Sequence, residues 1–327
     1  MKLHLPLTLL TAVLATFIAL PAQAVEAPEG YTTTYLNSPS ILETYSELTA
    51  EEYIAFILRR SQEITPSGAD YWTSSTPLVS GGHVFFGSYN SDSPVALSFK
   101  DGSGSAFYGQ STLTFDTLSN LTFSTITDNE AAISVEYGTL TITNVNDGQS
   151  DTVDVLFKDI KNTYTYGGAI DADTVTISNN GNVSFSGNSS SCYSCGGAIY
   201  AYYGLTISNN SDVSFSGNSS SYYNPSGGAI YAKNGLTISN NGNVSFSGNS
   251  SSSYDDDDFS SSYYTPTYGG AIYAYYGDVT ISNNSDVSFS GNSSSSNDDP
   301  SYGGAIYASN GDVTISNNSD VSFSGNS

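Results

Sequence analysis

Apolar and polar residues alternate along most of this chain in short runs that turn residues separate. In the copy that begins at Gly196, the runs are 197–201, 205–208 and 213–217, with YYG and NNSD between them. Gly, Asn and Asp supply the positive φ angles or local hydrogen bonds that tight turns require. Successive strand residues point to opposite faces, so the pattern predicts three short strands with one buried face. The residues of that face are Ile199, Ala201, Leu205, Ile207, Val213 and Phe215.

This unit is repeated along the chain. The sequence GGAI returns with FSGN downstream at nearly constant spacing, and the copies begin 29, 31, 42 and 34 residues apart. Length varies in the segment between the Asn of one copy and the first Gly of the next, which is rich in Ser, Tyr and Asp. A constant unit with insertions at one corner is typical of a solenoid. The copies begin at Gly167, Gly196, Gly227, Gly269 and Gly303.

Weaker copies precede the strong ones. Residues 130–144 align without a gap on 269–283, and residues 104–124 align in the same way on 270–290. The array therefore has at least seven units, and its earliest coil is expected near Gly81.

One unit cannot fold alone, because ordering its backbone costs more than its six buried apolar side chains return. Stacked units gain hydrogen bonds between coils and share a sealed apolar interior. We therefore predict an all-β fold, a right-handed parallel β-helix, with equivalent residues lying over one another. The predicted ladders are Ile170, Ile199, Ile230, Ile272 and Ile306, and Phe185, Phe215, Phe246, Phe289 and Phe323.

The glycine pair is explained less fully by this pattern. The first Gly follows a variable loop, which suits a left-handed conformation. The second Gly faces inward, where a side chain would not fit.

The segment 39–65 has a different pattern, with apolar residues at helix-like spacing among Glu and Arg. We interpret 25–80 as an N-terminal cap or adaptor with a short helical part, 81–166 as degenerate coils and 167–327 as the strong repeats. A helix that binds a partner is the alternative. The apolar residues are Ile41, Leu42, Leu48, Ile54, Phe56, Ile57 and Leu58.

Residues 1–24 have the pattern of a secretory signal, with Lys2, an apolar run and the small-residue site Ala22-Gln23-Ala24. The mature chain is expected to begin at Val25. No later segment has the roughly 20 consecutive apolar residues of a membrane helix. We therefore expect an exported chain with no membrane helix in its mature part.

Charge narrows the range of partners. The chain has 31 acidic and 7 basic residues, for a net charge of −24. Such a surface repels nucleic acid and anionic lipid, so neither is expected to bind. The 31 glycines and the long Ser and Asn runs also argue against an ordinary helical globule.

The coupled motifs resemble a known family. GGA(I/L/V) paired with FxxN, in an exported chain with Cys- and Ser-rich insertions, is similar to the polymorphic outer membrane protein repeats of chlamydiae and some other bacteria. Five coupled matches cover about half of the chain. The matching residues are Gly167, Gly168, Phe185 and Asn188; Gly196, Gly197, Phe215 and Asn218; Gly227, Gly228, Phe246 and Asn249; Gly269, Gly270, Phe289 and Asn292; and Gly303, Gly304, Phe323 and Asn326.

This resemblance implies the β-helical passenger of a type V autotransporter, displayed at the cell outer membrane or released, and used in adhesion. The implied partner is a host-cell or matrix surface protein or a glycan. Proteins of that family normally end in a transmembrane β-barrel, whereas this sequence stops at Ser327 directly after a repeat. We expect a fragment of an autotransporter or a chain released without its own anchor. The open last coil favours the fragment, because solenoids normally end in a cap.

Cys192 and Cys195 form a C-x-x-C sequence in one variable loop. An oxidising, exported context favours a local disulfide over a free redox pair. Zinc is disfavoured because no second Cys pair exists.

An aspartate run in the longest insertion is a weak calcium candidate, since hard oxygen ligands suit that ion. The glycine-punctuated spacing of calcium loops is missing, so we interpret the run as a solvated acidic loop and expect no cofactor. The run is Asp255, Asp256, Asp257 and Asp258, with Asp298 and Asp299 in a neighbouring insertion.

An enzyme is the second hypothesis, because parallel β-helices include polysaccharide lyases and hydrolases. A lyase needs a base beside acidic groups, and the strong repeats contain one basic residue, Lys233. Asp171 and Asp173 are the only paired carboxylates that resemble a hydrolase site. We interpret them as turn or surface residues and propose no catalytic residue.

The face opposite the apolar one carries Thr, Ser and Tyr. Ladders of Thr and Ser would suit ice binding or a passive surface layer, which is the third interpretation. Stacked exposed tyrosines favour a recognition surface for sugars or proteins, although rings that only cover the sheet explain them equally well. These residues are Tyr200, Tyr231, Tyr273 and Tyr307.

Overall fold

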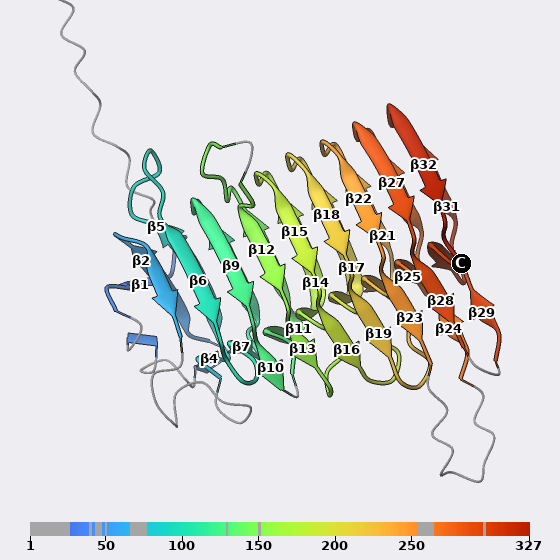
Figure 1. The fold of residues 1–327 in the computed structure, drawn as a ribbon. Helices are drawn as coiled ribbons and strands as arrows, with labels where there is room; N and C mark the ends of the chain where they lie inside the picture. The colour runs from blue at the N-terminus through green and yellow to red at the C-terminus, as the bar shows by residue number, and fades with distance from the viewer. Residues whose placement is uncertain are drawn as a thin grey trace, which may run out of the picture.

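The computed structural model describes residues 27–38, 41–42, 48–49, 51–65, 77–128, 130–149, 152–253, 265–296 and 299–327. Strands succeed one another along a single axis from β1 to β32 (Figure 1). They pair in parallel from coil to coil and stack as a β-solenoid of about eight turns. The predicted all-β parallel β-helix is therefore confirmed. The predicted signal peptide, 1–24, lies outside the described residues.

Two sheets run the length of the solenoid, and a third, shorter sheet begins at residue 127. The first contains the strands that carry the GGAI sequence and the strands that follow them, in 15 strands among the described residues. They are β1 (Thr32–Tyr35), β2 (Tyr53–Leu58), β4 (Val79–Ser80), β5 (His83–Ser88), β7 (Phe107–Tyr108), β8 (Thr112–Asp116), β11 (Ile133–Thr143), β14 (Ile170–Ser178), β17 (Ile199–Ser208), β20 (Ile230–Ala232), β21 (Leu236–Ser239), β25 (Ile272–Ala274), β26 (Val279–Ser282), β30 (Ile306–Ala308) and β31 (Val313–Ser316).

The second sheet contains the strands that carry the FSGN phenylalanine. They are β3 (Gln62–Ile64), β6 (Ala96–Lys100), β9 (Asn120–Ser124), β12 (Val155–Lys158), β15 (Val183–Ser186), β18 (Val213–Ser216), β22 (Val244–Ser247), β27 (Asp286–Ser290) and β32 (Asp320–Ser324).

A third sheet was not predicted, because its serine runs belong to the segments that we assigned to the variable insertions. The middle serine of each run points into the interior and is buried, as at Ser190, Ser220 and Ser251. Its strands are β10 (Thr127–Asp128), β13 (Lys161–Asn162), β16 (Ser189–Ser191), β19 (Ser219–Ser221), β23 (Ser250–Ser252) and β28 (Ser293–Ser295), and a separate pair is formed by β24 (Thr267–Tyr268) and β29 (Ser301–Tyr302). A strong coil thus has up to five strands rather than three, because each serine run pairs with the same run in the next coil.

The predicted ladders lie in register. Phe185 pairs with Phe215, and their rings stack at 4.8 Å between centroids and 4° between planes. The phenylalanine ladder continues backward through Phe157 and Phe123 to Phe99 in the weaker coils. All six residues of the predicted apolar face are at most 2% exposed. The apolar core is therefore one continuous column inside the solenoid.

The asparagine of FSGN forms a second kind of ladder. Asn218 donates from Nδ2 to the Phe185 carbonyl at 3.0 Å and to Asn249 Oδ1 at 2.9 Å, and its backbone N–H also donates to Asn249 Oδ1. The same bonds recur from Asn188 to Asn326. A parallel ladder runs through Asn180, Asn210, Asn241, Asn284 and Asn318. These amides satisfy one another at the turns, where the backbone has no strand partner.

The glycine pair is required by the close approach of successive coils. A Cβ on Gly197 would overlap the carbonyl oxygen of Gly228 in the next coil. The first glycine is left-handed in three of the strong copies, with a φ of 72° at Gly227, but not in the copies that begin at Gly167 and Gly196. In those two copies, a Cβ would overlap a carbonyl oxygen within the same copy.

The helical interpretation of the N-terminal segment is wrong. Residues 53–58 form strand β2, which pairs in parallel with β5, and β3 pairs with β6. The run IAFIL is buried on both faces, since Ile54 and Phe56 join the core and Ala55 and Ile57 pack with Phe85 outside it. A short run that is apolar on both faces has no periodicity that separates strand from helix. The solenoid sheets thus extend into the segment that we interpreted as a cap.

One alignment of the weaker copies is shifted by one residue in its first strand. Phe107 pairs with Ile133 in the isoleucine ladder, whereas the ungapped alignment placed it on Tyr273. A shift of one residue exchanges the two faces of a strand: Phe107 is buried and Tyr108 is exposed. The turn that follows the first strand differs in length between coils, which an ungapped alignment cannot represent.

Within the described ranges, no helix has the length and apolar character needed to cross a membrane.

Replacing Asn218 with Ala should lower the free energy of unfolding by about 2 to 4 kcal/mol, because buried donors and acceptors in both adjacent coils lose their partner. Urea unfolding followed by circular dichroism measures the change. Asn243→Ala is the matched control, since Asn243 is exposed and its bond to Asp212 Oδ1, the one seen within the described part of the chain, comes from its backbone N–H. Equal losses in the two variants would contradict a structural role for the ladder.

Gly197→Ala should destabilise the protein by at least about 2 kcal/mol, because the new methyl group meets the backbone of the next coil. Gly204→Ala is the control, because a Cβ at Gly204 has no atom within 4 Å. We expect that variant to stay within about 1 kcal/mol of the wild type. A melting temperature that falls equally in both variants would refute the packing argument.

Candidate functional site

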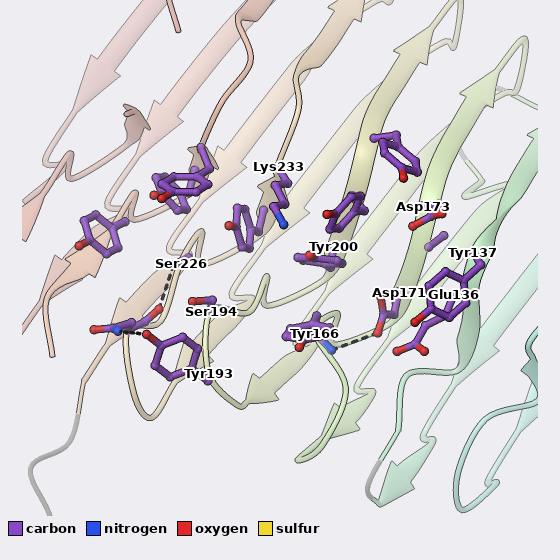
Figure 2. Close-up of a pocket in the computed structure, with 18 residues that line it drawn as sticks. Glu136, Tyr137, Tyr166, Asp171, Asp173, Tyr193, Ser194, Tyr200, Ser226 and Lys233 are labelled. Atoms are coloured by element: carbon purple, nitrogen blue, oxygen red, sulfur yellow. Dashed lines mark hydrogen bonds between the residues drawn. The ribbon is translucent and has the colours of Figure 1, made fainter. Parts of the chain in front are cut away.

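A cavity of about 670 Å³ lies on the outer side of the first sheet. Strands β11, β14, β17, β20 and β25 supply its floor, and the loops that precede the GGAI sequences supply a wall (Figure 2). The size is within the range of small-molecule sites, which is roughly 300 to 1,000 Å³. We call it the tyrosine pocket, because most of its lining is aromatic. The lining tyrosines are Tyr137, Tyr166, Tyr193, Tyr200, Tyr202, Tyr203, Tyr231, Tyr268, Tyr273 and Tyr275.

The floor follows from the repeat itself. The residue after the GGAI isoleucine points out of the core, and parallel pairing places each copy beside the next. In chain order, this outward row is Tyr108, Ser134, Asp171, Tyr200, Tyr231, Tyr273 and Tyr307. The tyrosine row therefore ends at an aspartate.

The four predicted recognition tyrosines point away from the core, but three of them are buried and Tyr307 is half-buried. Tyr200, Tyr231 and Tyr273 are 7%, 6% and 5% exposed and form a cluster of their own. Tyr231 and Tyr273 stack at 4.9 Å, and Tyr268 covers Tyr273 at 5.0 Å. Burial raises the pKa of all three phenols. The loop tyrosines exclude water from this row, which the strand pattern alone does not predict.

The exposed rings of the pocket come from positions that sequence reasoning did not select. Tyr193 and Tyr203 are 61% and 63% exposed. Tyr203 lies edge-on to Tyr202 at 4.8 Å between centroids. Asn224 Nδ2 donates to the Tyr193 hydroxyl at 2.9 Å, which links the loops of two successive coils. The sequence signal was the doubled tyrosine that follows GGAIYA and the tyrosines within the insertions.

Cys192 and Cys195 are joined by a disulfide in the loop that carries Tyr193 and Ser194. Tyr193 and Ser194 both line the tyrosine pocket. The covalent closure of this short loop limits the positions that the Tyr193 ring can take.

Three carboxylates meet at one end of the pocket, and we call Glu136, Asp171 and Asp173 the acidic end (Figure 2). Asp171 is 1% exposed, and its Oδ2 accepts a hydrogen bond from the Tyr166 N–H at 3.1 Å. Burial raises the pKa of Asp171 to about 7, and the charges of Glu136 and Asp173 contribute to the rise. The hydrogen bond from Tyr166 acts in the opposite direction and lowers the pKa. Burial also raises the pKa of Asp173. The interpretation of Asp171 as a surface residue is wrong, although its pairing with Asp173 was seen in the sequence.

Lys233 is the basic residue of the pocket lining. Its Nζ lies 3.9 Å from the centroid of the Tyr202 ring. It makes no ion pair with a carboxylate in the described part of the chain, where the ion pairs are Lys100–Glu63 and Lys158–Asp159.

The other predicted residues lie away from the pocket or outside the described residues. Asp255, Asp256, Asp257, Asp258 and Asp298 are outside the described residues. Asp299 accepts a hydrogen bond from the Thr265 N–H at 2.6 Å. The described residues contain no group of three or more His, Cys, Asp or Glu side chains arranged to hold a metal ion. The phenylalanines and asparagines of the motif build the core and its turns rather than a binding surface.

Four consecutive segments of the chain match the sequence model of one family, the Chlamydia polymorphic membrane protein repeat. The matched residues are 182–202, 212–233, 243–275 and 286–309. The resemblance that the coupled motifs indicated is thereby confirmed for these segments. Each match runs from a strand of the second sheet, through a variable loop, to the GGAI strand of the next coil. The acidic end precedes the first matched segment. Searches of curated proteins and of solved structures return no match.

The burial of Asp171 predicts a specific pH dependence of stability. Its folded pKa lies above the ordinary value, so the folded state binds the proton more tightly than the unfolded state. Stability therefore falls as pH rises from about 4 to 7, by up to about 1.4 kcal/mol per pH unit for this group. Asp171→Asn removes this cost, so it should melt at a higher temperature than the wild type at pH 8 and at the same temperature near pH 4.

Scanning calorimetry across this pH range measures the difference. Asp286→Asn, at an exposed position away from the pocket, is the control and should melt with the wild type throughout. A constant offset between Asp171→Asn and the wild type at all pH values would show that Asp171 is not the group responsible.

Proposed function

We propose that this protein is an exported surface protein that binds other surfaces through the tyrosine pocket and the loops beside it, as an adhesin does. The observation that carries the proposal is the pocket itself, which combines exposed aromatic rings with a rigid floor of stacked coils. The match to Chlamydia polymorphic membrane protein repeats supports it, because that family is named for membrane proteins. The passenger of an autotransporter, at the cell surface or released from it, is the context that we infer.

The physical basis is pre-organisation. Tyrosines bind sugars and proteins through a large flat ring and a hydroxyl, and they lose little conformational entropy because they have two side-chain torsions. Here Tyr202, Tyr203 and Tyr193 are held against neighbouring rings or amides before any ligand arrives. Loops on a rigid scaffold vary in sequence without loss of the fold, which suits a binding surface.

A polysaccharide hydrolase is the second candidate, and the state of Asp171 is the observation that favours it. A carboxylic acid with a raised pKa beside a second carboxylate is the acid–base arrangement of glycosidases. Release of reducing sugar from uronic-acid polymers, lost in Asp171→Asn and Asp173→Asn, would support this function.

Tyr193→Ser combined with Tyr203→Ser should reduce binding of the purified protein to cultured epithelial cells by about tenfold, because exposed aromatic anchors carry much of the energy of such interfaces. Flow cytometry with fluorescently labelled protein measures it. The control is Tyr164→Ser, which removes a ring that is 77% exposed and outside the pocket. Unchanged binding by the double variant would contradict the pocket as the binding surface.

A further inference from the structure

The acidic end contains a carboxylate, Asp171, that is 1% exposed and receives few hydrogen bonds from the protein. Among the described residues, the Tyr166 N–H is the single hydrogen-bond donor to the Asp171 carboxylate, and it bonds to Oδ2. A carboxylate accepts about four hydrogen bonds, and buried polar atoms are normally paired. Asp171 lines the pocket, so its carboxylate can accept further hydrogen bonds from a group that enters there.

Neighbouring carboxylates further destabilise the ionised form of Asp171. Glu136 from β11 and Asp173 from β14 lie close enough to Asp171 to raise its pKa. The titratable groups that face it from the neighbouring strands and loop are Tyr108, Tyr166 and Tyr200, and none of them is a cation. The described part of the chain supplies no basic partner to these carboxylates. A cation from outside would therefore gain attraction from all three at once.

The aromatic surroundings suit a flat cation in particular. Tyr137 and Tyr166 line the same end of the pocket (Figure 2). Elsewhere in this chain, the guanidinium of Arg59 lies 4.0 Å from the centroid of the Tyr35 ring and 4.8 Å from that of Tyr89. A guanidinium stacks on aromatic faces and presents a planar fork of donors to carboxylate oxygens, whereas an ammonium is a point charge without a face.

We infer that the acidic end of the tyrosine pocket binds the guanidinium of an arginine side chain presented by a protein partner. This inference rests on the proposed function and specifies the partner's chemistry. The guanidinium donates to Asp171 Oδ1, pairs with Glu136 or Asp173, and stacks on a pocket tyrosine. The net charge of −24 attracts a cationic partner and repels polyanions, so it favours a basic protein over a sulfated glycan or nucleic acid.

The site belongs to this chain rather than to the repeat in general. Glu136, Tyr166, Asp171 and Asp173 all precede residue 182, where the first family match begins. Asp171 occupies the position that is Tyr in every later strong coil. The replacement of Tyr by Asp at this one coil converts an aromatic row into a cation site.

The test is a calorimetric titration of the purified protein with the blocked peptide acetyl-Gly-Arg-Gly-amide. The comparison peptide carries citrulline in place of arginine, which keeps the planar shape and removes the charge. We expect the arginine peptide to bind at least tenfold more tightly than the citrulline peptide. Asp171→Asn should weaken the arginine peptide about tenfold, and Asp286→Asn should not change it. Affinity should fall between pH 8 and pH 5, as Asp171 takes up a proton.

Asp173→Asn is a second variant at the same end and should weaken the arginine peptide in the same direction. Equal binding of the two peptides, no binding of either, or arginine binding that survives both Asp variants would overturn the inference. A neutral oligosaccharide that displaces the arginine peptide would also overturn it, in favour of a carbohydrate site. If Asp171→Asn binds cells normally while the Tyr193→Ser and Tyr203→Ser double variant does not, the proposed function stands and the arginine site fails.

Discussion

Parallel pairing between coils holds equivalent residues about 4.8 Å apart, and the other features of this protein adapt to that spacing. Identical residues then lie over one another, so a residue type is acceptable only if it packs well against copies of itself. Phe does so by ring stacking, and Asn does so by donating to the amide oxygen of the next Asn while its own oxygen accepts from the previous one. The second glycine fits this spacing because it has no side chain, and the backbone of the next coil leaves no room for one.

The same spacing creates the candidate site. A residue that points outward in one coil is placed beside its equivalent in the next, so a single Tyr in the repeat becomes a row of rings. Rings at this separation cover one another, and the loop tyrosines cover them further, which removes the row from water. Exposed aromatic surface therefore comes from the irregular parts of the unit, the turn after GGAIYA and the insertions, where length and sequence differ between coils.

Departure from the repeat is what gives the pocket polarity. Asp171 keeps the outward position and the burial of the tyrosines beside it, but it replaces a phenol with a carboxylate that has few donors. A carboxylate in such surroundings holds its proton to higher pH and attracts cations when ionised. A repeat scaffold tolerates this local cost because the stability of each coil depends mainly on its contacts with its two neighbours.

The sequence by itself determined the solenoid, because every strong copy repeats the Phe, Asn and Gly residues that pack against their own equivalents in the next coil. The GGAI and FSGN spacing, the apolar face and the phenylalanine ladder were all predictable from it, and so was the pairing of Asp171 with Asp173. Only the tertiary structure decided which outward residues are exposed, since Tyr200 and Tyr193 have the same chemistry and differ in what the loops place over them. The strand at 53–58 and the shift at Phe107 were likewise settled by pairing with neighbouring coils, because a short apolar run and a turn of variable length carry no register of their own.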